Sequence, residues 1–404
     1  MSWVKAQLAK IEEQGFDCKV EKYVCPECTD SYALKEFIQD HAEQTYCDYC
    51  GQSSDDSDEC ISVHLSKLLK VIVDGIETEW GDPNNEGVGW DGREGGWQGV
   101  SVIDTFSLIN DELYDELEMD IEQLKEDILN SLSDQEWCRL DPYGLRLFEE
   151  NLSTWDRFCE QIMYETRYVF FRNEDEVYKF GSIYAQPYDI LETIGEAIKD
   201  LDLIRIEPGT YQFYRGRTHD DPSGFTKAED LGPPRREKAL QPNRMSPAGI
   251  PMFYGATDEQ TAIEEIRDDK DFVTIGMFEN TQKLNLIDLS SKIPFPSLFD
   301  EEKRSLRNDV IFIRQFVRDL SKPLSKDLKE HIDYVPTQIV TEYFRRVYRF
   351  ENVERIDGIL YPSSKKTGGV CCVLFFQNQD FTQDMEESEK PMNLLTSSLN
   401  THKL

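Results

Sequence analysis

Two pairs of cysteines have the spacing of a metal site. Cys25-x-x-Cys28 is followed, after eighteen residues, by Cys47-x-x-Cys50. This arrangement is typical of a four-thiolate zinc site, in which each pair holds the metal from a tight turn. A redox role for either pair would need a βαβ context, and the surrounding sequence shows none. Because four thiolates fill the coordination sphere, the pattern predicts a structural zinc rather than a catalytic one.

A second group of reactive residue types follows a short apolar run in the stretch GILYPSSKKTGG. It contains a Ser-x-x-Lys that begins at Ser363 and a Lys-Thr-Gly that begins at Lys366. Both motifs occur in serine acyl-transferases of the penicillin-binding type. In those enzymes the motifs come from different parts of the chain, whereas here Lys366 would have to serve in both. The stretch therefore disfavours a serine nucleophile.

Arginines and a tyrosine gather in two blocks of the C-terminal half. Arg215 and Arg217 lie in the aromatic, strand-like block GTYQFYRGRTHD, and Arg244 and Tyr254 lie in NRMSPAGIPMFYGATDEQTAIEEIR. A guanidinium is a planar fork of donors that suits phosphate oxygens. Arg215 and Arg244 are therefore phosphate-binding candidates. Arg217 is either a further candidate or only a surface charge.

Two adjacent glutamates lie in a segment with helical spacing. A capping-box pattern from Thr257 to Gln260 predicts the start of a helix. Its apolar face consists of Ala262, Ile263 and Ile266. At 100° per residue, Glu265 lies about 107° from the centre of that face and Glu264 about 153°. The helical phase predicts that Glu265 lines a pocket and that Glu264 points to water.

Four blocks of the C-terminal half together resemble the RES domain family, which is named for its Arg, Glu and Ser. They are the two blocks above, YVPTQIVTEYFRR, and IDGILYPSSKKTGGVCCVLFF, and the resemblance covers residues 205–378. It implies that Arg215, Glu265 and Ser363 are catalytic, with Ser363 at the exit of a strand over 359–361. We expect substrate to be bound by a further set, Tyr214, Arg244, Tyr254, Ser364 and Lys365.

RES domains are NAD-degrading toxins similar in fold to ADP-ribosyltransferases, so the resemblance implies that NAD is the substrate. Cleavage of the nicotinamide–ribose bond passes through an oxocarbenium-like state, which needs an anion near the ribose, cations for the diphosphate and a dry slot for nicotinamide. Glu265, the arginines and Tyr254 are of suitable types, although Tyr254 also fits a half-buried strand tyrosine. Ser363 is expected to position the substrate.

The function that we expect is that of a RES-type toxin or defence enzyme, an NAD phosphorylase or glycohydrolase. The acceptor of the ADP-ribose unit is inorganic phosphate or water, and a protein ADP-ribosyltransferase is an alternative. A catalytically inert binding module is the other alternative. RES toxins are commonly paired with an antitoxin, so the N-terminal half is a candidate for binding an antitoxin or a trigger protein.

The sequence patterns around these residues predict an α+β fold. We expect a zinc-knuckle region over 1–75, an acidic, mostly helical domain over 76–203, a mixed α/β RES catalytic domain over 204–379, and a disordered tail over 380–404. The second region loosely resembles the helical HEPN/RES-type N-terminal domain. The Arg and His pair of HEPN ribonucleases is absent, because no histidine occurs between His64 and His219.

Helical and loop patterns subdivide the N-terminal half. Residues 32–41, between the cysteine pairs, have helical spacing, and residues 81–100 contain seven glycines and read as a loop that carries Trp90 and Trp97. A later helical stripe consists of Leu113, Leu117, Ile121, Leu124 and Ile128. Cys371 and Cys372 are predicted to be small core residues of a strand.

Charge is distributed unevenly along the chain. Residues 1–200 have a net charge of −30, from 46 acidic and 16 basic residues, and the remainder has a net charge of −5. A field of that sign repels phosphates, which argues against nucleic acid as a partner. No apolar run approaches the ~20 residues that span a bilayer. The sequence thus predicts a soluble, cytoplasmic protein without a membrane partner.

Overall fold

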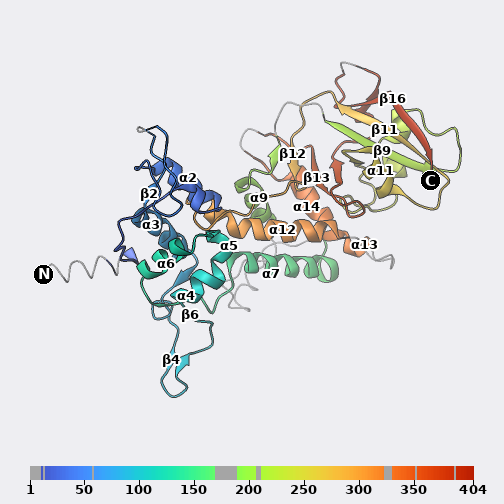
Figure 1. The fold of residues 1–404 in the computed structure, drawn as a ribbon. Coiled ribbons are helices and arrows are strands. Elements are labelled where there is room, and N and C mark those ends of the chain that lie inside the picture. The colour runs from blue at the N-terminus through green and yellow to red at the C-terminus, as the bar shows by residue number, and fades with distance from the viewer. Residues whose placement is uncertain are drawn as a thin grey trace. The chain divides into compact units, whose positions relative to one another are not determined.

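The computed structural model describes residues 11, 14–56, 59–168, 189–205, 211–322, 330–350, 353–385 and 388–404. The chain forms two compact units. Unit 1 comprises Met1–Arg146 and Phe295–Arg307, and unit 2 comprises Leu147–Pro294 and Asn308–Leu404. Each unit contains both helices and strands (Figure 1), which confirms the predicted α+β class.

Unit 1 is built from short helices and two- or three-stranded sheets. Its elements, including the 3-10 helices η1 and η5 and the π-helix η2, are β1 (Tyr23–Val24), η1 (Pro26–Cys28), α2 (Tyr32–His41), β2 (Val63–His64), α3 (Leu65–Ile76), β3 (Trp80–Gly81), β4 (Trp90–Asp91), β5 (Gly96–Trp97), β6 (Ile103–Asp104), α4 (Thr105–Ser107), η2 (Leu108–Glu112), α5 (Tyr114–Leu117), α6 (Glu122–Ser131), β7 (Glu136–Arg139) and η5 (Arg304–Leu306).

Helices α2 and α3 provide much of the core of unit 1. The predicted helix over 32–41 is confirmed with the same bounds, and its Leu34 and Ile38 are fully buried. Helix α3 buries an apolar face beside them, and His64 caps it by accepting a hydrogen bond from the backbone N–H of Ser66. These helices cover the turns that carry the cysteine pairs.

The later helical stripe of unit 1 is broken rather than continuous. Leu113 and Leu117 belong to the region of α5, whereas Leu124 and Ile128 lie on α6. The break falls at Glu118, which ends α5 in the left-handed conformation at φ 45°. The chain therefore turns between the two helices. The apolar residues of the stripe lie on or next to two separate helices that contribute to the same core.

The glycine-rich stretch of unit 1 contains a short hairpin within its loop. Strands β4 and β5 pair Trp90 with Trp97, whose rings meet edge to face with centroids 5.2 Å apart. Trp90 is exposed, and the indole N–H of Trp97 donates to Glu136 over 3.0 Å. A separate three-stranded sheet in the order β3-β7-β6 lies in the same unit, so the acidic region contains more strand than we predicted.

Residues 295–307 complete unit 1 although they come from the C-terminal half of the sequence. Leu298 and Phe299 are buried in its core. Arg307 donates to Glu79 and to Glu116, each over 2.8 Å, in a largely buried ion-pair network. The N-terminal unit therefore does not consist of a continuous piece of the sequence.

Unit 2 combines a large sheet with helices. Its elements, including the π-helix η3 and the 3-10 helices η4 and η6, are α7 (Leu147–Glu160), η3 (Gln161–Glu165), α9 (Ile190–Asp200), β8 (Ile204–Arg205), β9 (Gln212–His219), α10 (Ala228–Leu231), η4 (Arg236–Lys238), β10 (Phe253–Ala256), α11 (Glu259–Ile266), β11 (Phe272–Asn280), β12 (Leu286–Asp288), α12 (Arg307–Ser321), α13 (Glu330–Asp333), α14 (Val335–Arg346), β13 (Gly358–Pro362), β14 (Val370–Leu374), η6 (Asn378–Asp380), β15 (Phe381–Gln383) and β16 (Met392–Lys403).

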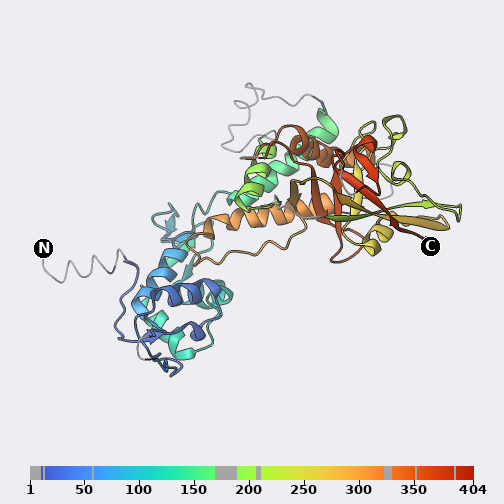
Figure 2. The same cartoon turned by 90° about the horizontal axis from the view of Figure 1, so that it is seen from above.

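The sheet has the strand order β15-β16-β11-β9-β10-β14-β13-β12-β8 and is mainly antiparallel. Strands β12 and β13, and strands β15 and β16, pair in parallel. Figure 2 shows β9, β11 and β16 side by side at one end of the sheet. The predicted strand over 359–361 is confirmed within β13, and Cys371 and Cys372 are buried in β14 as expected.

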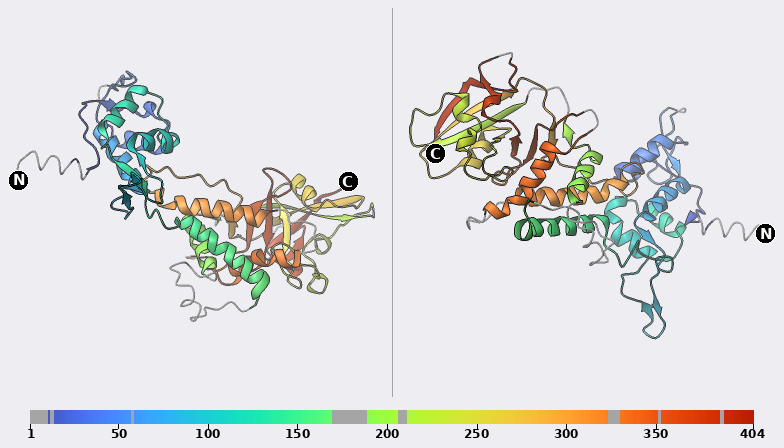
Figure 3. Two further views of the ribbon diagram at one scale, coloured as in Figure 1. Left: turned by 90° about the horizontal axis from the view of Figure 1, so that it is seen from below. Right: turned by 180° about the vertical axis from the view of Figure 1, so that it is seen from behind.

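The two faces of the sheet are covered differently. One face packs Ile287, Ile359 and Val373 against helices α7, α9, α12 and α14, and α11 packs further along it. Helices α7 and α12 run side by side (Figures 1 and 3), where the rings of Trp155 and Phe316 meet with centroids 5.1 Å apart. The other face carries a cluster of phenylalanines and leucines with α10.

Two predictions about organisation differ from the structure. The predicted disordered tail over 380–404 is wrong for its described residues, because β15 and β16 join the sheet there and bury Met392 and Leu394. Strand β16 pairs with β11 along most of its length although its composition is largely polar. The compact units also divide after Arg146, whereas the predicted domain boundary lies at 203. None of the helices in the described ranges is long and apolar enough to cross a membrane.

Candidate active site and thiol cluster

A pocket of about 810 Å³ in unit 2 opens where strands β9 and β10 separate. The two strands pair at Tyr214 and Ala256, and beyond that pair the residues of β9 face the pocket. The remaining walls come mainly from β10, α11, residues 238–244 and 250–252, and the turn after β13. Its described lining contains one carboxylate, from Glu265, and five cationic side chains, Arg215, Arg217, Lys238, Arg244 and Lys365.

Arg215 is held firmly in this wall. Its Nε donates to the carbonyl of Leu231 over 2.6 Å, and its Nη1 donates to the carbonyl of Tyr254 over 2.5 Å. Burial, followed by the charge of Arg217, lowers the pKa of Arg215 to about 9, which leaves it cationic at neutral pH. The guanidinium thus joins β10 to the end of α10 and still has donors left for a ligand.

The two tyrosines predicted to bind substrate both line the pocket. The hydroxyl of Tyr254 lies 2.8 Å from that of Ser246, and burial raises the pKa of Tyr254 to about 12. Tyr254 is therefore a neutral, oriented ring at neutral pH. Tyr214 packs beside Ile263 and Ile266 of α11.

Arg244 reaches the pocket from the loop before β10. Its Nη1 donates to the carbonyl of Leu320 over 2.6 Å, and its guanidinium carbon lies 6.0 Å from the centre of the Tyr334 ring. Gly249, in the same loop, adopts φ 86°, a conformation that favours glycine. These contacts hold the guanidinium of Arg244, which lines the same pocket as the residues of β9.

Helix α11 places its two glutamates as the helical phase predicts. Glu265 lines the pocket, whereas Glu264 accepts from the side chain of Gln260 over 3.0 Å and lies 3.9 Å from Arg267 outside it. The predicted cap is wrong by one residue, because Asp258 accepts from the backbone N–H of Thr261 over 2.9 Å. A carboxylate accepts this bond at least as well as a threonine hydroxyl.

Ser363 is directly connected to Glu265. Its hydroxyl donates to Oε1 of Glu265 in a short hydrogen bond and accepts from the backbone N–H groups of Lys365, over 3.2 Å, and Lys366, over 3.0 Å. Ser363 does not line the pocket, whereas Ser364 does. The hydroxyl is thus placed to hold the carboxylate, and the predicted contact of Ser363 with substrate stays a prediction.

The turn after β13 holds α11 at both ends. The amino group of Lys366 donates to the capping residue Asp258 over 2.6 Å, and that of Lys365 donates to the backbone carbonyl of Glu265 over 2.5 Å. A Cβ on Gly369 would lie 2.6 Å from the hydroxyl oxygen of Thr261, so the turn approaches the helix closely. The lysines and glycines of GILYPSSKKTGG therefore fix the orientation of Glu265.

Cys371 is the nearest thiol to this pair. Burial and the nearby carboxylate of Glu265 raise the pKa of Cys371 to about 12. The thiol therefore remains protonated at neutral pH, which fits a core residue of β14 rather than a nucleophile.

Three members of this site were missed or left open by sequence reasoning. Lys238 ends the short helix η4 and Ser246 lies in the loop after it, in a segment without hydrophobic periodicity, so no sequence signal identified them. Arg217 could have been found, because residues two apart on a strand share a face and Arg215 was already a candidate.

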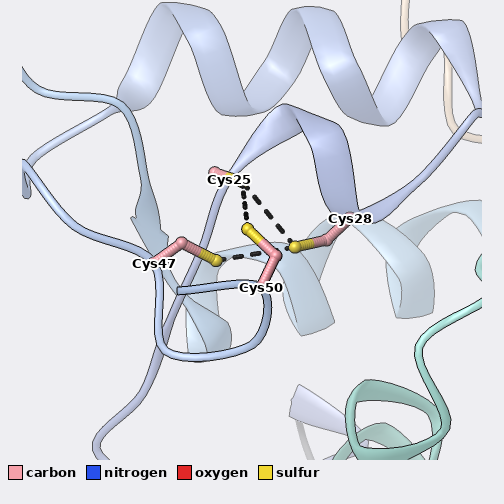
Figure 4. A group of neighbouring side chains, drawn as sticks. All are labelled: Cys25, Cys28, Cys47 and Cys50. Atoms are coloured by element: carbon pink, nitrogen blue, oxygen red, sulfur yellow. Dashed lines mark hydrogen bonds between the residues drawn. The ribbon is translucent and has the colours of Figure 1, made fainter. Parts of the chain in front are cut away.

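The four predicted metal ligands meet in unit 1 (Figure 4). The sulfur of Cys25 lies 3.7 Å from that of Cys28 and 3.4 Å from that of Cys50, and the sulfurs of Cys28 and Cys47 are 3.5 Å apart. Cys25 and Cys28 come from the turn at η1, and the other pair comes from the loop after α2.

This cluster fits a tetrahedral metal ion. All four sulfur atoms lie within 4.8 Å of one another, and zinc bound at ~2.3 Å would place them about 3.8 Å apart. The adjacent thiols of Cys25 and Cys47, together with burial, raise the pKa of Cys28 above its ordinary value. A bound cation would offset the repulsion between thiolates, so the four cysteines can hold one metal ion.

Comparison with known families gives two matches. A family model described as "HEPN/RES N-terminal domain 1" matches residues 40–176, and one described as "RES domain" matches residues 214–394. No curated protein and no solved structure matches the chain. Arg215, Glu265 and Ser363 fall within the second match, while the first begins between the two cysteine pairs.

Proposed function

The chain is a RES-domain protein with an N-terminal HEPN/RES domain, and we propose that it is an enzyme that cleaves the nicotinamide–ribose bond of NAD. The observation that carries this proposal is the carboxylate of Glu265, held by Ser363 in a pocket whose other charged side chains, among the described residues, are all cationic. A single anion among cations suits a substrate with a cationic centre beside a diphosphate.

The proposed reaction separates charge in a way that this pocket can stabilise. As the bond from ribose C1′ to the nicotinamide nitrogen breaks, its electron pair leaves with nicotinamide, which becomes neutral and needs no general acid. The positive charge moves to the ribose, where Glu265 stabilises it. Ser363 acts as a positioning residue for that carboxylate, and Arg215 and Arg244 bind the diphosphate.

An acceptor oxygen then bonds to ribose C1′ and loses its proton to solvent. With inorganic phosphate the product is ADP-ribose phosphorylated at that carbon, and with water it is ADP-ribose. We propose these two acceptors because the chain contains a RES domain. On the same basis we propose that the protein acts as a toxin or defence enzyme. Tyr254 offers a neutral ring against which nicotinamide can pack, since its hydroxyl is tied to Ser246.

We further propose that zinc occupies the thiol cluster and stabilises the fold of unit 1 without taking part in the chemistry. Its cysteines supply four ligands, which leaves no open position. The strongly acidic N-terminal half is proposed as the part that recognises an antitoxin or trigger protein.

One experiment tests the function. Purified full-length protein is incubated with NAD, with and without inorganic phosphate, and the products are identified by mass. Release of nicotinamide together with ADP-ribose or its phosphate ester supports the proposal. Transfer of ADP-ribose to added protein indicates the transferase alternative, and unchanged NAD indicates a binding module.

A further inference from the structure

Arg217 lies on the same face of strand β9 as Arg215. The two residues are separated by Gly216, and both line the pocket. They also contact successive carbonyls at the end of α10: Arg215 binds that of Leu231, and Arg217 donates from Nη2 to that of Gly232 over 2.9 Å. Strand β9 therefore presents two neighbouring guanidinium groups to the backbone segment at the end of α10.

The donors of Arg217 are not all used by the protein. Its Nε is shielded from solvent and has no hydrogen-bond partner among the described residues. A buried donor without a partner is unfavourable, because it has lost the hydrogen bond that it makes to water in the unfolded chain. One carbonyl of Gly232 needs a single donor, so anchoring the turn does not account for a charged fork with five donors.

The charges of Arg215 and Arg217 also indicate an anionic ligand. The cation of Arg217 lowers the pKa of Arg215, so the two groups repel each other. Within the described residues neither arginine forms an ion pair, and Asp230 is the acidic residue whose charge acts on Arg217. By contrast, the exposed Arg235 in the following loop is paired with Glu229. Two adjacent cations without a carboxylate suit a ligand that carries two adjacent anions.

We propose that Arg217 is a diphosphate-binding residue, and that it forms with Arg215 a two-arginine clamp on β9 for the two phosphates of the dinucleotide. The inference rests on the proposed function and adds to it a residue that belongs to none of the RES motif positions identified above. A phosphate oxygen supplies the acceptor that Nε of Arg217 lacks and offsets the repulsion within the clamp. Binding here places the diphosphate at β9, with the ribose toward Glu265 across the same pocket.

The test measures binding of ADP and of NAD to the full-length protein by calorimetry, alongside NAD turnover. Arg217→Gln removes the charge and is expected to weaken ADP binding about tenfold or more and to raise KM for NAD, with a smaller change in kcat. Arg217→Lys keeps a charge and a donor for Gly232 but loses the fork, so we expect weaker binding with an unchanged melting temperature. Arg235→Gln, which removes the same charge outside this pocket, is the control and should stay within about twofold.

The outcomes separate this inference from the proposed function. If Arg217→Gln and Arg217→Lys bind ADP as the wild type does, the clamp is wrong and Arg217 only supports the turn. Failure of the folded wild type to bind ADP also overturns it. If the wild type binds ADP, the variants lose it, and NAD is nevertheless not cleaved, the clamp stands and the proposed function fails. If Arg217→Gln does not fold, Arg217→Lys decides.

Discussion

Glu264 and Glu265 are sequence neighbours with different surroundings. Glu265 lines the pocket and accepts from Ser363, whereas Glu264 is bound by Gln260 outside it. We expect Glu265→Gln, which keeps the shape but removes the anion, to reduce NAD turnover on the order of 10²-fold or more, because the charge stabilises the cationic ribose. Binding of NAD should change far less. Steady-state kinetics with nicotinamide release as the readout measures both.

The matched control is Glu264→Gln on the same helix, which should remain close to wild type. If Glu264→Gln abolishes turnover while Glu265→Gln leaves it intact, the site assignment is wrong. If neither change matters, the NAD-cleaving proposal fails.

At the residue scale, helical phase was sufficient to place Glu265 but not to assign Ser363. A period of 3.6 residues determines which side of a helix faces a neighbour, and α11 follows it. The bond from Ser363 to Glu265 joins residues 98 positions apart, and it depends on how a turn folds back onto the helix. No local pattern encodes that contact, so the sequence did not predict Glu265 as a partner of the hydroxyl.

At the scale of elements, α11 depends on Asp258 for both its cap and its contact with the turn after β13. We expect Asp258→Ala to lower the free energy of unfolding by about 1 kcal/mol, mainly through loss of the cap. The ion pair with Lys366 adds little, since both side chains are about a third or more exposed. Asp258→Asn keeps a capping side chain and should lose less. Thr257→Ala, which changes the cap expected from sequence, should be neutral in denaturant titrations.

The stabilisation by Asp258 is expected to depend on pH. Burial opposes ionisation, but hydrogen bonds from Lys366 and Thr261 outweigh it and lower the pKa of Asp258. Because the folded-state pKa lies below the unfolded value of about 3.9, this stabilisation is fully present above that pH and is lost as pH falls through the folded-state pKa. The stability gap between wild type and Asp258→Asn should therefore shrink in strongly acidic buffer. A gap that grows on acidification would contradict the assignment.

The thiol cluster gives a third prediction at this scale. Cys25→Ser should remove one equivalent of bound zinc and destabilise unit 1, because metal-binding free energy contributes to folding there. Cys60→Ser, which changes an exposed cysteine outside the cluster, is the control. Metal content by mass spectrometry and thermal melting with and without a chelator provide the measurements. Equal zinc content in both variants would show that Cys25 is not a ligand.

The elements themselves were predictable to different degrees. The cysteine spacing and helix α2 were read correctly, because both are local patterns. The stripe over 113–128 was not, since a left-handed residue at Glu118 leaves no trace in hydrophobic periodicity. Strand β16 was missed because it gains stability from pairing with β11 and from burying Met392 and Leu394, which a polar composition conceals.

At the scale of the whole molecule, the chain enters and leaves its units more than once. Helices α7 and α9 belong to unit 2 and contribute Trp155, Phe158, Ile194 and Ile198 to its core. The predicted boundary at 203 followed the start of the RES resemblance at residue 205, whereas the division into units follows buried contacts. The boundary of an active fragment should therefore be set by these two helices.

We accordingly expect a fragment over 147–404 to keep NAD turnover and a fragment over 203–404 to be poorly folded. The shorter fragment lacks both helices and exposes the apolar face of the sheet that they cover, at a cost of several kcal/mol by the ~25 cal/mol per Å² of apolar burial. In either fragment Leu298 and Phe299 lose the unit 1 core that buries them, so both fragments carry Leu298→Ser and Phe299→Ser as a matched change. Cooperative melting and nicotinamide release are the measurements. An active, cooperatively folded 203–404 fragment would show that α7 and α9 are dispensable, and an inactive but well-folded 147–404 fragment would show that catalysis requires unit 1.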